Sequence, residues 1–282
     1  MNSIIKKPVK ALIELPTWLG DSVMTTPAIE NIITYYNNVE ITAIGTDSSI
    51  EMIKNHPKVV NTITIDSKNK SLFMPYIKIG FFDVYFTFRG SIRAKLLKFA
   101  VKAKIKYQFN HLDYPNRHQV EKYVDFINQS LSSNYPAGNL ISCINKNKNK
   151  NKNKNNSKIL GINPGASYGS AKRWYPEQFA KVAKALSSKF DIFIFGGLGE
   201  KDIAQQIEKY LISNNIFNFK NLAGKTSISE LTNYISNLDI FVTGDSGPMH
   251  LAASLQIPTI AILSSILTHS CSSVYFNSSG IF

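Results

Sequence analysis

Short apolar runs alternate along this chain with stretches in which apolar residues recur at helical spacing. Runs bounded by polar residues and glycine are typical of buried strands, and the longer amphipathic stretches, such as 176–186 and 200–211, are typical of helices. Alternation of the two predicts parallel sheets with crossover helices. The expected strands lie at residues 10–15, 40–45, 60–65, 82–88 and 104–109, and then at 158–163, 190–195, 238–243 and 259–263.

An Asn-Lys repeat at residues 145–156 separates these two sets of strands. Such a segment has nothing to bury in a core and its charges repel one another, so we expect a disordered, extended linker. The predicted organisation is an α/β fold of two Rossmann-like domains with a cleft between them. The domains cover residues 1–144 and 158–282, and the low-complexity linker covers 145–157.

Composition narrows the function classes. The 282 residues are 44% hydrophobic but include no run long enough to cross a membrane, and the N-terminus lacks the apolar segment of a signal peptide. Cys143 and Cys271 are isolated and match no disulfide or metal framework. The net charge is +13, and it is still +7 without the six lysines between residues 145 and 158. A basic balance suits a phosphate-bearing ligand or an anionic surface, whereas no nucleic-acid-binding motif is present.

The turn after the first predicted strand is the first candidate site. The strand ends in Leu-Pro-Thr-Trp-Leu-Gly-Asp21, and Ser-Val-Met-Thr-Thr-Pro-Ala28 follows as the start of a helix. A helix start offers free N–H groups, and ligands of open α/β sheets usually bind where strands end. Asp21 is the one carboxylate in this turn, so it is the candidate general base. The alternative is an aspartate that only caps the helix.

Three loops in the second half also connect a strand to a helix. The first contains Pro-Gly-Ala-Ser-Tyr-Gly-Ser-Ala-Lys172-Arg-Trp, and the second is Gly-Gly-Leu-Gly-Glu200, which lacks the GxGxxG dinucleotide fingerprint. The third is Gly-Asp245-Ser-Gly-Pro-Met-His250. Each one alone is explained by helix capping, and His250 by burial in a helix. Together they predict a nucleotide site in which helix-start N–H groups and the Ser246 hydroxyl bind a pyrophosphate.

These segments resemble the ADP-heptose:lipopolysaccharide heptosyltransferases of glycosyltransferase family 9. The resemblance covers about residues 10–262, and the Pro-x-Trp-x-Gly-Asp opening is most similar to the heptosyltransferase II branch. It implies a GT-B fold, with the acceptor on the N-terminal domain and the nucleotide sugar on the C-terminal one. It also implies inverting transfer of heptose from ADP-heptose to a heptose of the lipopolysaccharide or lipooligosaccharide inner core.

The resemblance also assigns residues. Asp21 is the expected catalytic base, with Gly20 and Trp18 as candidates on the acceptor side. The expected ADP-heptose-binding residues are Ala166, Ser167, Lys172, Glu200, Asp245, Ser246, Gly247 and His250. These residue types fit a single displacement, in which a carboxylate takes the acceptor's proton while a lysine and helix-start N–H groups stabilise the leaving diphosphate.

Further expectations concern cofactors and location. No Asp-x-Asp triad occurs in the chain, so no bound metal is expected, and no other cofactor is expected either. No nucleic-acid partner is expected, because no nucleic-acid-binding motif is present. The implied acceptor is lipid-linked, which predicts a cytoplasmic protein in peripheral contact with the cytoplasmic face of the inner membrane.

From about Ser264 the tail departs from the family pattern, since it has no helical period and few charges. A shifted reading frame or a truncation is the hypothesis that this suggests. Two alternatives to an active heptosyltransferase therefore stay open. One is a truncated member that binds the ADP-sugar without transferring it, and the other is a different nucleotide-sugar transferase of GT-B type.

Overall fold

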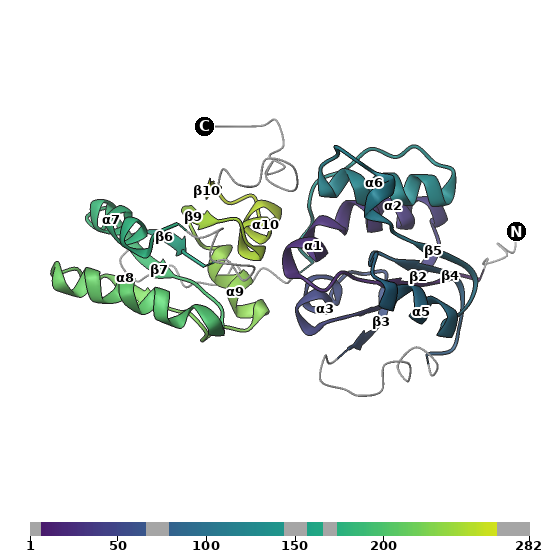
Figure 1. Cartoon of the computed structure of the whole chain (residues 1–282), viewed down its shortest axis with the longest axis horizontal. Helices are drawn as coiled ribbons and strands as arrows, with labels where there is room; N and C mark the ends of the chain where they lie inside the picture. The colour runs from purple at the N-terminus through teal and green to yellow at the C-terminus, as the bar shows by residue number, and fades with distance from the viewer. Residues whose placement is uncertain (1–6, 66–78, 144–156, 166–173, 264–282) are drawn as a thin grey trace, which may run out of the picture. The chain divides into compact units, whose positions relative to one another are not determined.

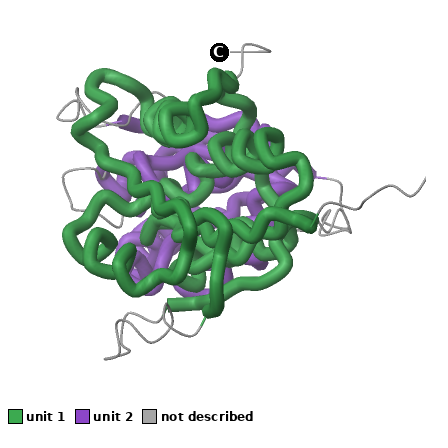
Figure 2. Tube along the Cα trace, turned by 90° about the vertical axis from the view of Figure 1, so that its right-hand side faces the viewer, with its two compact units in different colours: residues 1–144 green, residues 145–282 purple. Residues whose placement is uncertain are grey.

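The computed structural model describes residues 7–65, 79–143, 157–165 and 174–263 (Figure 1). The chain divides into two compact units, residues 1–144 and residues 145–282, which Figure 2 colours separately. Most of the predicted linker and the whole of the atypical tail lie outside the described residues. Among the residues that are described, no helix is long and apolar enough to cross a membrane.

The first unit contains a parallel sheet with the strand order β3-β2-β1-β4-β5. Each strand lies within two residues of a predicted run. Three of these strands, β1, β2 and β4, are mostly buried and largely apolar, as strands inside a parallel sheet usually are, whereas β3 and β5 are only partly buried. The strands are β1 (Val9–Glu14), β2 (Val39–Gly45), β3 (Val59–Thr64), β4 (Phe81–Thr87) and β5 (Lys102–Gln108).

Helices cover both faces of this sheet, as Figure 1 shows. Ala11 and Ile13 of β1 pack on one face with α2 and α6, while Leu12 between them packs on the other face with Leu97 of α5. This alternation follows from the two-residue period of a strand. The helices are α1 (Leu19–Met24), α2 (Thr26–Tyr36), α3 (Asp47–Ile53), α5 (Ile92–Ala100) and α6 (Gln119–Leu131), with a 3-10 turn η1 (His111–Asp113).

The helical segment after β1 is two helices, α1 and α2, with a break at Thr25. Pro27 stands at the start of α2 and has no N–H to bond the preceding turn. The hydroxyls of Thr25 and Thr26 donate instead to the carbonyl oxygens of Ser22 and Val23, at 2.8 and 2.7 Å. Side-chain hydroxyls therefore satisfy carbonyls that a continuous helix would have bonded through its backbone.

The second unit repeats the architecture with the strand order β10-β9-β6-β7-β8, again with parallel pairs throughout. Four of its strands were predicted, whereas β8 was not. The strands are β6 (Lys158–Asn163), β7 (Phe190–Ile194), β8 (Phe219–Asn221), β9 (Ile240–Gly244) and β10 (Thr259–Ile262). The helices are α7 (Pro176–Leu186), α8 (Lys201–Ser213), α9 (Ile228–Ile235) and α10 (Gly247–Ser254), with a 3-10 turn η3 (Leu198–Glu200).

The topology of each sheet marks one position for a ligand. In both units the first strand, β1 or β6, lies in the centre, and later strands are added on one side and then on the other. The connections therefore leave in opposite directions between β1 and β4 and between β6 and β9. A crevice opens beyond the carboxyl ends of strands at such a switch point, where open α/β sheets usually bind ligands.

Candidate active site

Asp21 lies at the carboxyl edge of the first sheet, just after β1. Trp18 has extended backbone angles and is the N-cap of α1, so Asp21 falls in the first turn of the helix and is not the capping residue. Its side chain is partly buried, Gly20 beside it is buried, and the Trp18 side chain is 54% exposed. Asp21 is the acidic residue of the first turn of α1, near the positive end of the helix dipole.

Hydroxyl groups at the start of α3 fix the backbone of the loop between β1 and α1. Ser49 Oγ donates to the carbonyl oxygen of Pro16 at 2.5 Å, and Thr46 Oγ1 donates to that of Thr17 at 3.0 Å. Ser22 Oγ lies 2.9 Å from Ser49 Oγ and closes the cluster. The segment that leads to the candidate base is therefore held by side chains from the second strand-helix connection.

A buried carboxylate lies at the switch point of the same sheet. Glu14, the last residue of β1, is fully buried, and the Tyr85 hydroxyl donates to its Oε2 at 2.5 Å. Arg89, after β4, places one guanidinium nitrogen 3.4 Å from Glu14 Oε1 and another 2.8 Å from Thr17 Oγ1. Arg89 thus joins the ends of β1 and β4 to the loop that precedes Asp21.

In the second unit, Asn163 joins the ends of the two strands at the switch point. It is the last residue of β6 and is 2% exposed. Its Nδ2 lies 3.1 Å from Thr243 Oγ1 of β9 and 3.0 Å from the Oγ of Ser246. The loop that begins α10 is therefore bonded to the end of the neighbouring strand.

Asp245, Ser246 and Gly247 lie at the start of α10 and are partly exposed. Ser246 is the N-cap, but its side chain makes no capping hydrogen bond to the helix, because it faces Asn163 and Thr243. A helix start without a side-chain cap keeps N–H groups available to an anion. His250, further along α10, is 7% exposed, as a buried helix residue would be.

Glu200 brings the other two predicted loops of this unit together. It is 7% exposed, and its Oε2 accepts a hydrogen bond from the N–H of Gly197 at 2.6 Å. The carboxylate lies against Gly165, where an added Cβ would fall 2.1 Å from the Glu200 carboxyl carbon. The loops after β6 and β7 therefore meet around one carboxylate at the carboxyl edge of the sheet.

The structure thus groups the sequence-predicted residues by unit. Trp18, Gly20 and Asp21 lie together after β1, whereas Glu200 and Asp245, Ser246, Gly247 and His250 lie around the strand ends of the second unit. Ala166, Ser167 and Lys172 lie outside the described residues. Within the part of the chain that is described, no three His, Cys, Asp or Glu side chains are grouped to hold a metal ion.

Sequence reasoning did not select Glu14, Arg89 or Asn163 as site residues. Glu14 and Asn163 carry a usable signal, because each is a polar residue at the end of an apolar strand. Arg89 has none, since only the pairing of β4 with β1 brings it to Glu14.

Cys143 remains an incidental thiol. It is partly buried, and burial raises the pKa of its thiol to about 11. The thiol therefore stays protonated near neutral pH, which disfavours a nucleophilic role. Cys271 lies outside the described residues.

Comparison with known proteins identifies the family to which this architecture belongs. The profile of glycosyltransferase family 9 (heptosyltransferase) matches residues 84–266. The chain belongs to this family, and the predicted enzyme class, a glycosyltransferase, is confirmed.

Individual relatives agree with this assignment. Lipooligosaccharide heptosyltransferase 2 from Campylobacter jejuni subsp. jejuni serotype O:2 is 39% identical over 259 residues, which cover 90% of this chain and 80% of that protein. The E. coli ADP-heptose lipopolysaccharide heptosyltransferase II structure superposes with a TM-score of 0.74 at 20% identity, covering 90% of this chain and 84% of the other.

A second solved structure is E. coli heptosyltransferase WaaC with ADP-2-deoxy-2-fluoro heptose. Its TM-score is 0.72 at 16% identity, and the match covers 89% of this chain and 88% of that one. The two parallel sheets and these superpositions confirm the predicted fold class, two Rossmann-like domains of the GT-B type.

Proposed function

We propose that this chain transfers heptose from ADP-heptose to a heptose of the lipopolysaccharide or lipooligosaccharide inner core, with inversion at the anomeric carbon. The observation that carries the proposal is 39% identity, over 90% of the chain, to a lipooligosaccharide heptosyltransferase 2. The solved structures of similar fold are named for ADP-heptose or contain an ADP-heptose analogue, which supports this donor.

The first unit supplies the base. In the proposed reaction the Asp21 carboxylate accepts the proton of the acceptor hydroxyl as its oxygen bonds to the anomeric carbon. Such a general base contributes roughly 10²- to 10⁴-fold to a rate. The hydroxyl cluster around Ser49 and the Arg89–Thr17 hydrogen bond support this role, because they fix the loop that carries the base. Trp18, which is 54% exposed, is proposed to contact the acceptor sugar.

The second unit binds the donor. As the new bond forms, the bond from the anomeric carbon to the ADP oxygen breaks and its electron pair stays on the diphosphate. The start of α10 at Ser246 and Gly247, which has no side-chain cap, supports a site for that charge. Ala166, Ser167 and Lys172 are proposed to contact the same phosphates, and Glu200 the ribose. Asp245 and His250 are proposed to contact the diphosphate and the heptose.

Two further expectations complete the proposal. Transfer is expected to need no metal ion, so activity should persist in EDTA. The protein is proposed to act in the cytoplasm, at the cytoplasmic face of the inner membrane, because an inner-core acceptor is attached to a lipid. Its basic balance supports contact with an anionic membrane.

A transfer assay read by mass spectrometry tests the proposed function. Purified protein is incubated with an inner-core acceptor that carries one heptose, and with either ADP-heptose or UDP-glucose. The expected result is growth of the acceptor by one heptose with ADP-heptose alone. Transfer from the UDP-sugar but not from ADP-heptose would overturn the donor assignment.

A further inference from the structure

Helix α5 of the first unit has an apolar stripe that points away from the sheet. Ile92, Leu96 and Phe99 are 78%, 53% and 84% exposed, and their spacing puts them on one face of the helix. The opposite face is buried through Ala94 and Leu97. The helix is therefore apolar on two sides, although only one side is needed to pack on the sheet.

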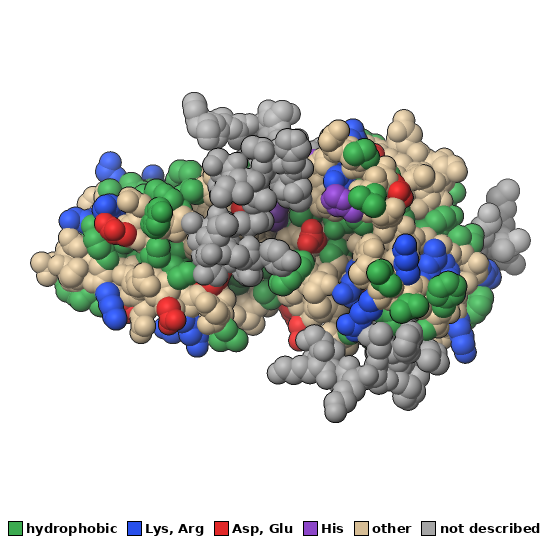
Figure 3. Space-filling view, viewed as in Figure 1, with side chains coloured by type: hydrophobic (Ala, Val, Ile, Leu, Met, Phe, Trp, Pro, Cys, Tyr) green, Lys and Arg blue, Asp and Glu red, His purple; other side chains and the backbone are tan. Residues whose placement is uncertain are grey.

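Basic residues surround this stripe. Residues 92–108 contain no Asp or Glu. They contain six cations, three in α5 and three in the edge strand β5, namely Arg93, Lys95, Lys98, Lys102, Lys104 and Lys106. Figure 3 shows Lys and Arg side chains among hydrophobic ones over the region of α5 in Figure 1. We call the outward residues of these two elements the α5–β5 surface.

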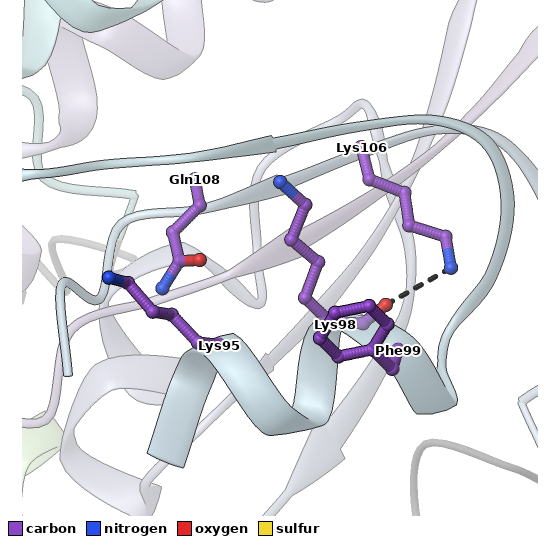
Figure 4. Close-up of a pocket in the computed structure, with 5 residues that line it drawn as sticks. All are labelled: Lys95, Lys98, Phe99, Lys106 and Gln108. Carbon is purple, nitrogen blue, oxygen red and sulfur yellow. Dashed lines mark hydrogen bonds between the residues drawn. The ribbon is translucent and has the colours of Figure 1, made fainter. Parts of the chain in front are cut away.

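A pocket of about 370 Å³ lies within the α5–β5 surface. Figure 4 shows the side chains that line it, which are Lys95, Lys98, Phe99, Lys106 and Gln108. Lys106 Nζ donates to the carbonyl oxygen of Lys98 at 3.0 Å and so joins the strand to the helix. Three lysines and a glutamine line this pocket beside Phe99, so cations lie next to an apolar hollow, a combination that suits a group with an anionic end and an apolar part.

Edge-strand packing explains only part of this arrangement. Lysines on an edge strand prevent pairing with other chains, which accounts for the charges on β5. It does not account for Ile92, Leu96 and Phe99, which are large, exposed and close to the cations. Apolar side chains flanked by Lys and Arg are typical of helices that lie in a membrane interface, where apolar groups enter the acyl boundary and cations meet phosphates.

We propose that the α5–β5 surface binds the protein to an anionic phospholipid bilayer. Charge complementarity selects this occupant over a second copy of the chain, because two such surfaces would repel each other. A nucleic acid would match the cations but would leave the apolar stripe in water. The inference rests on the proposed function only in that a lipid-linked acceptor gives membrane binding a purpose.

Sedimentation with vesicles tests the proposal without donor or acceptor. The full chain is expected to bind vesicles of phosphatidylglycerol and phosphatidylcholine in equal parts, and to bind phosphatidylcholine vesicles weakly. Because each cation near an anionic surface strengthens binding, the double variant Lys95→Glu/Lys98→Glu should bind at least about tenfold more weakly. Phe99→Ser, which leaves the charges in place, should weaken binding by about tenfold.

The matched control reverses the same number of charges elsewhere. Lys189 and Lys209 are exposed in the second unit, so Lys189→Glu/Lys209→Glu should stay within about threefold of the wild type. Equal loss in both double variants would overturn the inference, because net charge alone would then explain binding. The inference would also be overturned if the chain did not bind anionic vesicles but bound a random-sequence DNA duplex, and if Lys95→Glu/Lys98→Glu abolished that binding.

Transfer to a delipidated acceptor separates this inference from the proposed function. The α5–β5 variants should transfer heptose to it at the wild-type rate. If the wild-type chain transfers heptose but binds no vesicles, the inference is overturned and the proposed function stands. If the wild-type chain binds vesicles, the variants do not, and no heptose is transferred, the proposed function is overturned and the inference stands.

Discussion

Glu14 is a fully buried ionisable residue at the end of β1. It is balanced by the Tyr85 hydroxyl and by Arg89, whose side chain is 21% exposed. A buried carboxylate is costly unless such partners satisfy it. The second hydrogen bond of Arg89, to Thr17, extends this network to the loop before the candidate base.

Removing Arg89 should therefore destabilise the protein. We expect Arg89→Met to lower the free energy of unfolding by about 2 kcal/mol, because it leaves the buried Glu14 carboxylate short of a charged partner. Arg117→Met is the control, since Arg117 forms an exposed ion pair with Asp125 at 3.0 Å and should contribute less than about 1 kcal/mol. Urea unfolding measures both, and an Arg89 effect no larger than that of Arg117 would contradict this account.

At the residue scale, the sequence was informative about candidate site residues that lie in a strand-to-helix turn. Asp21 and Ser246 could be selected because each follows a strand and lies at a helix start. Asn163 could have been selected as a polar residue at the end of an apolar strand, but its partner Thr243 could not, because it lies 80 positions away along the chain. Arg89 carried no signal at all, because its partner Glu14 lies 75 positions away. Only strand order brings such residues together.

At the element scale, the loops after β6 and β7 depend on a glycine. Gly165 lies so close to the Glu200 carboxylate that a Cβ would overlap it, and Glu200 is itself held by the N–H of Gly197. A side chain at position 165 would displace Glu200 from its place at the sheet edge.

This contact predicts an effect on donor binding. Gly165→Ala should weaken ADP-heptose binding by about tenfold, about 1.4 kcal/mol, because Glu200 must move. Gly199→Ala is the control in the same loop, since a Cβ there meets no atom within 4 Å, and it should change the affinity by less than about twofold. Calorimetric titration gives both dissociation constants. Equal affinities for the two variants would show that the Gly165–Glu200 contact plays no part in the donor site.

At the element scale, strands of four or more residues were predicted whether they are buried, as β1 is, or partly exposed, as β5 is. The short strand β8, Phe219–Asn221, was missed because three residues give no period to detect. The break at Thr25 was missed because it depends on how hydroxyls and Pro27 satisfy the turn between α1 and α2.

At the scale of the whole molecule, the repeat at 145–156 and the two sets of strands were enough to predict two α/β halves. Each half has its own sheet and its own buried core. The α5–β5 surface was not predicted, because an exposed apolar stripe and a core-facing one look alike in a helical pattern.

The proposed division of labour predicts where ADP protects the chain. Hydrogen exchange followed by mass spectrometry should show slower exchange with ADP at residues 163–165, 196–200 and 244–250 of the second unit. The sheet of the first unit should exchange at the same rate with and without ADP, because in the proposed arrangement it does not contact the nucleotide. Protection centred on residues 15–25 would contradict this prediction, because it would place the nucleotide on the first unit.

Kinetics of Asp21→Asn test most directly whether Asp21 is the base of a heptosyl transfer. We predict a fall in kcat of about 10²-fold or more with unchanged ADP affinity, because the amide keeps the size of the side chain but cannot accept the proton. Asp47→Asn, which changes the first-turn acid of α3 in the same unit, serves as the control and should retain wild-type kcat. An Asp21→Asn protein that transfers heptose at the wild-type rate would contradict the account.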